Sequence, residues 1–268
     1  MCLGIPDAIG TSTTRAAMTQ NELDEATEIR FERQRPPPPA FNVPGIVLGL
    51  IAVFIAVHAL RMFAIGPLAD SFVLVDFAFI PGCYGSAAEI CSYQRAGAGL
   101  WSPLTYSFLH GDWMHLGVNS VWLLAFGTPV ARRLGATRFL VFSGCGAIAG
   151  AAVFYFLNPT LVAPVIGASG VVSALMGGAC RFAFGGARSP MPLGSQVFLP
   201  VVPITEALAN RTVLIFVAVF FATNLLLGSA AGGFLGGGTV AWEAHLGGFA
   251  FGFLLFKLFD PRSRTPAA

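Results

Sequence analysis

The chain has 268 residues, of which 55% are hydrophobic and only 10% are charged, and its mean hydropathy is +0.74. A soluble domain of this size would be about one-quarter charged, so the composition excludes an ordinary water-soluble enzyme and a disordered protein. The formal net charge of +2 is too small for a nucleic-acid partner. Composition therefore predicts a membrane protein that crosses the bilayer several times.

Residues 1–43 form the first segment, and they predict a disordered cytoplasmic tail. Six acids and four arginines are followed by four prolines at 36–39, which is typical of a solvated segment with a stiff end. The segment lacks the basic start, apolar run and cleavage site of a signal peptide, so we expect no removal on export. The membrane domain is predicted at 44–260, and a short second tail at 261–268.

Six apolar stretches follow the tail, each near the ~20 residues that a helix needs to cross a bilayer core of ~30 Å. A barrel of alternating strands is the rival, but these runs are continuous and rich in Ala, Leu and Gly, which favours helices. The predicted fold is an all-α membrane protein with six transmembrane helices. The predicted spans are at about 45–65, 113–131, 138–158, 166–185, 212–228 and 239–259.

The basic residues predict the orientation of these spans. All but two of the 15 Lys and Arg lie in the amino-terminal tail, at the carboxyl end, or in and around the links after spans two and four. The positive-inside rule then places both termini in the cytoplasm, and we expect a multi-pass protein of a bacterial plasma (inner) membrane. The link 66–112 lies outside, where Cys83 and Cys91 would either form a disulfide or remain two free thiols.

Three predicted spans carry polar side chains at a similar depth. His115 and Asn119 lie on span two, Ser169 on span four and His245 on span six. All three spans run from outside to inside, which places these groups mostly ~3 to 9 Å below the outer membrane surface at ~1.5 Å per residue. Polar groups are costly inside hydrocarbon, so we expect them to meet in one water-accessible site.

Ser169 and His245 are the candidate nucleophile and base. Ser169 stands in the run GASG at 167–170, and small neighbours at a helix start leave free backbone N–H groups of the kind an oxyanion hole requires. His245 precedes Gly248 and Gly252, a small-xxx-small pair that favours close helix packing, and would take the serine proton. Taken alone, each motif is more typical of helix packing or of a helix–helix hydrogen bond than of catalysis.

The polar residues near Ser169 and His245 indicate which catalytic groups the site could contain. Glu243 is the nearest carboxylate to His245, but an offset of two places it on another helix face, which predicts a Ser-His dyad instead of a triad. His115 and Asn119 are four apart on one face and offer two donors to an oxyanion. A zinc site that includes His110 is the rival, but five residues separate His110 from His115 and no His-Glu-x-x-His motif occurs. We expect neither metal nor cofactor.

Over about 100–260 the chain resembles the rhomboid family of intramembrane serine proteases. Three motifs in order carry the resemblance: LHGDWMHLGVN at 109–119, GASG at 167–170, and Ala244-His245 followed by Gly248 and Gly252. The resemblance implies a six-helix rhomboid-like fold with Ser169 as nucleophile and His245 as general base. It also assigns His115, Asn119 and the Ser169 backbone N–H to the oxyanion hole, with His110, Gly167, Gly170, Gly248 and Gly252 as structural residues near the site.

The function expected from this resemblance is cleavage of single-span membrane proteins near the outer membrane surface. Its partners would be the transmembrane helices of substrates and the lipid bilayer, and the glycine-rich run 232–238 is a candidate lid. One alternative is a catalytically inactive rhomboid-like protein that binds transmembrane helices; loss of Ser169 or His245 would mark that class, and both are present. A small-solute transporter is a second alternative, but it would predict two matching halves, which the sequence lacks.

Overall fold

The computed structural model describes residues 43–85, 89–184, 199–228 and 241–261, and every regular element in these ranges is a helix. One isolated antiparallel bridge, between Phe79 and Val165, is the only strand-like pairing there. The predicted tails lie almost wholly outside the described residues, as does the whole of the run 232–238. The all-α class predicted from the continuous apolar runs is confirmed for the described part of the chain.

Helices occupy each of the six predicted stretches. Two of them, Gly45–Ala64 and Ala136–Leu157, are long and apolar enough to cross a membrane by length and composition. Each of the first two stretches contains a π-helical turn, η1 or η5. The helices are α2 (Gly45–Ala59) with η1 (Leu60–Ala64), α5 (Trp113–Trp122) with η5 (Leu123–Gly127) and α6 (Thr128–Leu134), α7 (Ala136–Leu157), α8 (Ser169–Ala179), α10 (Arg211–Gly228) and α12 (Trp242–Phe259).

Helix α8 is much shorter than the span predicted at 166–185. Its 11 residues cover only ~16 Å, and it begins at Ser169 after a segment in which Gly167 has a φ of +122°, a backbone conformation that favours glycine. Every residue from Gly170 to Ala179 is buried, and α8 packs mainly against α12, α7 and η5. Surrounding protein can shield the irregular backbone before α8, which is why a short helix is tolerated there.

Helices α8 and α12 pack with their backbones in contact. A Cβ atom added to Gly248 would lie 2.1 Å from the carbonyl oxygen of Gly170, and one added to Gly252 would lie 1.9 Å from that of Ala174. Only glycine permits this approach, because any side chain would overlap the facing backbone. The two glycines of the small-xxx-small pair therefore define where α12 meets the first two turns of α8.

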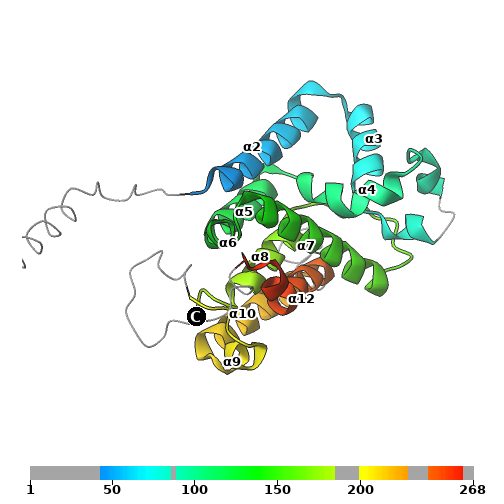
Figure 1. Ribbon diagram of the computed structural model, residues 1–268. Coiled ribbons are helices and arrows are strands. Elements are labelled where there is room, and N and C mark those ends of the chain that lie inside the picture. Colours follow the sequence, from blue (N-terminus) through cyan, green and yellow to red (C-terminus); the bar gives the residue numbers. More distant parts are fainter. Residues whose placement is uncertain (1–42, 86–88, 185–198, 229–240, 262–268) are drawn as a thin grey trace, which may run out of the picture. The chain divides into compact units, whose positions relative to one another are not determined.

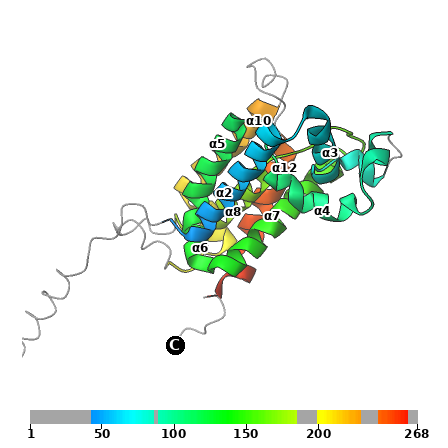
Figure 2. The same cartoon turned by 90° about the horizontal axis from the view of Figure 1, so that it is seen from above.

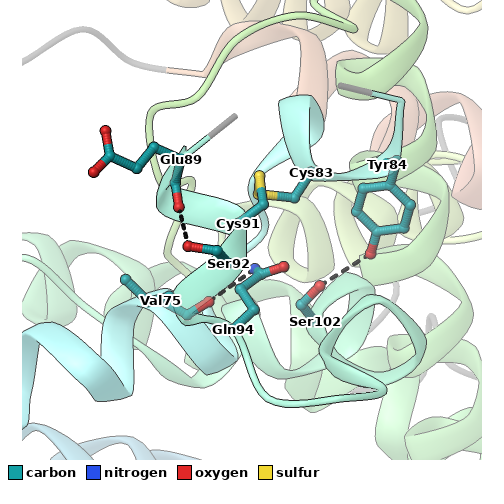
Figure 3. The surroundings of a disulfide bond; sticks show 8 residues. All are labelled: Val75, Cys83, Tyr84, Glu89, Cys91, Ser92, Gln94 and Ser102. Carbon is teal, nitrogen blue, oxygen red and sulfur yellow. Dashed lines mark hydrogen bonds between the residues drawn. A yellow bond between two sulfur atoms is a disulfide. The ribbon is translucent and has the colours of Figure 1, made fainter. Parts of the chain in front are cut away.

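The link between α2 and α5 forms a set of short helices on one side of the bundle (Figures 1 and 2). Cys83 and Cys91, whose pairing the sequence left open, form a disulfide within it (Figure 3). The Tyr84 hydroxyl donates to the Gly99 carbonyl at 2.8 Å, and helix α4 of the link packs on α7. The link consists of α3 (Pro67–Phe77), η2 (Pro81–Tyr84), η3 (Glu89–Tyr93), α4 (Ala98–Thr105) and η4 (Tyr106–Phe108).

Two buried arginines tie segments that are distant in the sequence. Arg61, in η1, donates to both carboxylate oxygens of Asp70 at 2.6 and 3.2 Å and to the His110 carbonyl at 2.8 Å. Arg133, at the end of α6, makes a two-pronged ion pair with Asp260 just after α12, at 3.2 and 2.8 Å. The first arginine anchors the loop that leads into α5, and the second joins the ends of α6 and α12.

Candidate active site

Ser169 is the first residue of α8 and is half-buried. The first hydrogen bond of the helix runs from the Val172 N–H to the Ala168 carbonyl at 2.9 Å. The N–H groups of the residues between them, including that of Ser169, have no acceptor within the helix. The helix dipole adds a partial positive charge at the same place. This end of α8 is therefore suited to stabilise a negative charge next to the serine hydroxyl.

Helix α5 brings His115 and Asn119 to the segment that precedes Ser169. The Asp112 side chain accepts a hydrogen bond from the His115 backbone N–H at 2.8 Å and so caps the start of α5. A Cβ atom added to Gly167 would lie 2.7 Å from both Cε1 and Nε2 of His115 and 3.7 Å from Nδ2 of Asn119. The missing side chain of Gly167 thus leaves the space that the His115 ring needs beside the start of α8.

Asn119 presents an unused hydrogen-bond donor at this position. Its side chain is buried, and its Nδ2 atom has no hydrogen-bond partner among the described residues. A buried donor without a partner costs about 1–3 kcal/mol, so such a group in a folded protein calls for an explanation. A carbonyl oxygen that gains negative charge beside Gly167 would supply the missing acceptor.

Helix α12 brings His245 to the same end of α8. The carbonyl oxygen of Ala244 lies 3.7 Å from a Cβ added to Gly170, and Gly248, one turn later, contacts the Gly170 carbonyl. Within the part of the chain that the structure describes, no hydrogen bond joins the Ser169 hydroxyl to the His245 ring. Catalytic hydrogen bonds are often long before substrate binds and tighten in the complex, so the approach of the two helices is the informative feature.

Asn224 contacts the His245 ring, and the sequence prediction missed it. Its Oδ1 atom, on α10, is hydrogen-bonded to Nδ1 of His245. The expectation that no third group orients the imidazole is therefore wrong. Glu243 points elsewhere, as its helical offset predicted, and accepts a hydrogen bond from Asn158 Nδ2 at 3.2 Å. The available signal was a polar side chain inside the apolar run 212–228, which has the same cost in hydrocarbon as those on the other spans.

His110 lies beside His115, and within the described residues no hydrogen bond or ring contact joins its side chain to α8 or α12. Its ring is buried, 5.2 Å from the His115 ring and 5.3 Å from that of Phe54 between centroids. Burial lowers the pKa of His110 to about 4, with a smaller contribution from the nearby His115, so the imidazole is neutral at pH 7. Across the described ranges, no group of three or more His, Cys, Asp or Glu could hold a metal ion.

Comparison with known proteins identifies the family of the chain. A family model described as a rhomboid domain matches residues 97–261, a range that contains α5, α8, α10 and α12 and therefore every residue of the candidate site. The chain belongs to the rhomboid family. Members of this family are integral membrane proteins, and this rhomboid protein is accordingly one as well.

Three curated relatives illustrate the similarity. Rhomboid-related protein 3 of Homo sapiens is 40% identical over 84 residues, which is 31% of this chain and 20% of the relative. RHOMBOID-like protein 4 of Arabidopsis thaliana is 30% identical over 158 residues, 58% of this chain and 33% of the relative. The mitochondrial Rhomboid protein 1 of Saccharomyces cerevisiae is 38% identical over 76 residues, 26% of this chain and 22% of the relative. The chain thus matches a third or less of each relative's length.

Proposed function

We propose that this rhomboid protein is an intramembrane serine protease that cleaves single-span membrane proteins near the outer membrane surface. Ser169 is the nucleophile and His245 the general base. The observation that carries the proposal is the unpaired Nδ2 donor of Asn119, next to the His115 ring and Gly167 at the start of α8. Helix packing alone does not require a buried, unsatisfied donor beside Gly167, two residues before Ser169, whereas an oxyanion hole does.

The proposed reaction is acyl transfer through the serine. His245 Nε2 takes the proton of the Ser169 hydroxyl as its oxygen attacks the scissile carbonyl carbon. The carbonyl oxygen becomes negative and receives hydrogen bonds from His115, Asn119 and the Ser169 backbone N–H. The protonated His245 then gives its proton to the leaving amine, and water, activated by the same imidazole, hydrolyses the ester on Ser169.

The setting that we propose for this reaction is a six-span protein with both termini in the cytoplasm of a bacterium. The disulfide between Cys83 and Cys91 supports an oxidising compartment for the link 66–112, and the outer face of a bacterial plasma membrane provides one. Substrates are transmembrane helices that can unwind near small residues or proline, because a packed helix hides its carbonyl carbons. The lipid bilayer holds enzyme and substrate together.

Fluorophosphonate labelling of the purified protein, together with cleavage of a reporter transmembrane helix, tests the proposal. Ser169→Ala and His245→Ala should each abolish cleavage, with the double variant no worse than either single one. Asn119→Ala should lower the rate by roughly 10- to 1,000-fold while labelling stays detectable, since one oxyanion donor contributes up to ~4 kcal/mol. Ser173→Ala is the matched control, because Ser173 is a buried serine one turn further along α8.

The results of these experiments distinguish a protease from a catalytically inactive protein. Normal cleavage by Ser169→Ala, in a preparation free of other proteases, would refute the assignment of the nucleophile. A folded wild-type protein that is neither labelled nor active would instead favour a catalytically inactive rhomboid-like protein that binds transmembrane helices. Full activity of Asn119→Ala would mean that the unpaired donor has another role.

A further inference from the structure

The contact between Asn224 and His245 determines which ring nitrogen carries the proton. Asn224 has one acceptor, Oδ1, and one donor group, Nδ2, and Nδ2 donates to the Phe220 carbonyl one turn earlier on α10 at 2.7 Å. With Nδ2 used in this way, the atom that faces the imidazole is the acceptor Oδ1. A hydrogen bond to an acceptor requires a proton on Nδ1 of His245. The neutral ring then has its lone pair on Nε2.

We propose that Asn224 is the positioning residue of the catalytic base, an inference that rests on the proposed protease function. By accepting the Nδ1 proton, Asn224 holds His245 in the tautomer whose Nε2 can take the Ser169 proton. The Nδ1–H donor is present in both the imidazole and the imidazolium, so this hydrogen bond persists while Nε2 gains and loses its proton. Asn224 touches neither substrate nor the reacting atoms, and it acts only through His245.

A carboxamide suits this position better than a carboxylate would. In the triads of soluble serine proteases an aspartate holds the histidine, but an ionised aspartate within an apolar span is expensive. A neutral asparagine supplies the same acceptor without a buried charge. Its orientation is fixed by the bond to Phe220, and α10 is fixed against α12 by the Phe220 and Phe249 rings, whose centroids are 5.2 Å apart.

The competing explanation is that Asn224 only holds two helices together, and the chain contains a matched residue for that role. Asn158, at the end of α7, also donates from Nδ2 to the carbonyl four residues earlier, that of Phe154, at 3.2 Å. It also bonds α12, but through Glu243 instead of His245. Asn158→Leu therefore removes a polar contact to α12 without touching the imidazole, and Asn224→Leu removes the acceptor at Nδ1.

The first experiment compares kcat and KM for cleavage of a reporter transmembrane helix, and the rate of fluorophosphonate labelling, in these variants. Asn224→Leu should lower kcat and the labelling rate by roughly 100-fold with KM nearly unchanged, the loss expected when a catalytic group is misplaced by about 1 Å. Asn158→Leu should leave both within a few-fold of wild type. Equal losses in Asn224→Leu and Asn158→Leu would overturn the positioning role.

A second measurement uses the wild-type protein and does not depend on activity. The nitrogen-15 chemical shifts of the histidine rings, assigned to His245 with a His245→Gln sample, distinguish the two neutral tautomers. We expect a protonated Nδ1 and an unprotonated Nε2, and a proton on Nε2 would overturn the inference even if Asn224→Leu does not fold. If the wild-type protein is neither labelled nor active but Nδ1 is protonated, the protease function fails while the hydrogen bond stands.

Discussion

Replacing Gly252 by alanine tests the idea that contact between the backbones of α8 and α12 builds the site. Gly252 lies seven residues, about two turns, after His245 on α12. Its added methyl would lie 1.9 Å from the Ala174 carbonyl oxygen and 2.9 Å from the Ala174 Cα. Neither atom can rotate away, because both belong to the backbone of the buried helix α8.

The displacement can be worked out from these distances. Ordinary van der Waals contact begins at 3.4 Å, so the helices must separate by about 1.5 Å if they move along the line of the clash. Overpacking of this kind costs about 1–3 kcal/mol, and we expect the upper end because a backbone carbonyl is the obstacle. A shift of this size, transmitted to His245, would also lower the rate of serine activation by about 100-fold.

The control is Gly49→Ala on α2, where an added Cβ meets nothing within 4 Å. Both variants share the intrinsic gain of about 1 kcal/mol from replacing glycine by alanine in a helix, so their difference isolates the clash. Equilibrium unfolding in mixed detergent micelles measures stability, and fluorophosphonate labelling measures serine activation. We expect Gly252→Ala to be about 3 kcal/mol less stable than Gly49→Ala and poorly labelled. Equal stability and equal labelling of the two variants would refute the contact.

Two further substitutions probe other parts of the fold. Gly167→Ala would place a methyl 2.7 Å from the His115 ring, at a residue whose φ is +122°. We therefore expect labelling and cleavage to fall at least 10-fold and stability to fall by about 1–3 kcal/mol. Unchanged activity would show that the position of the His115 ring is unimportant. Asp260→Ala would remove the carboxylate that pairs with the buried Arg133 and should cost about 3–5 kcal/mol in unfolding measurements. Arg95→Ala should cost less, because Arg95 is 77% exposed and its backbone N–H still donates to Asp76; similar losses would contradict the buried pair.

The sequence predicts the helices well because a bilayer-spanning helix leaves a long, continuous signal. Each apolar run contains a helix, and the polar residues chosen within three of those runs, Ser169, His245 and the pair His115 and Asn119, lie on α8, α12 and α5 as expected. The spacing arguments also hold where they depend on one helix alone. Glu243 is bonded to Asn158 and not to His245, because two residues along a helix turn a side chain to another face.

The errors concern features that depend on neighbouring helices. The length of α8 cannot be read from hydropathy, because the run 166–185 is apolar apart from Ser169, Ser173 and Arg181, whereas the helix covers only Ser169–Ala179. Asn224 and His245 are 21 residues apart, and no periodic pattern relates a residue near the end of α10 to one near the start of α12. Finding Asn224 would have required treating every polar residue within a span as needing a partner, which is the rule that identified Asn119.

The site owes its geometry to positions without side chains. Lipid tails are as apolar as leucine, so the hydrophobic effect does not drive helices together inside a bilayer, and close backbone contact must replace it. Gly248 contacts the Gly170 carbonyl next to Ser169. The His115 ring occupies the space that a side chain at position 167 would fill. A methyl group at any of these positions would directly change the distance from α8 to His115 or to His245, whereas substitutions on the exposed faces of the same helices would not. If close packing around α8 positions the catalytic residues, alanine should therefore be tolerated at Gly49 but not at these glycines.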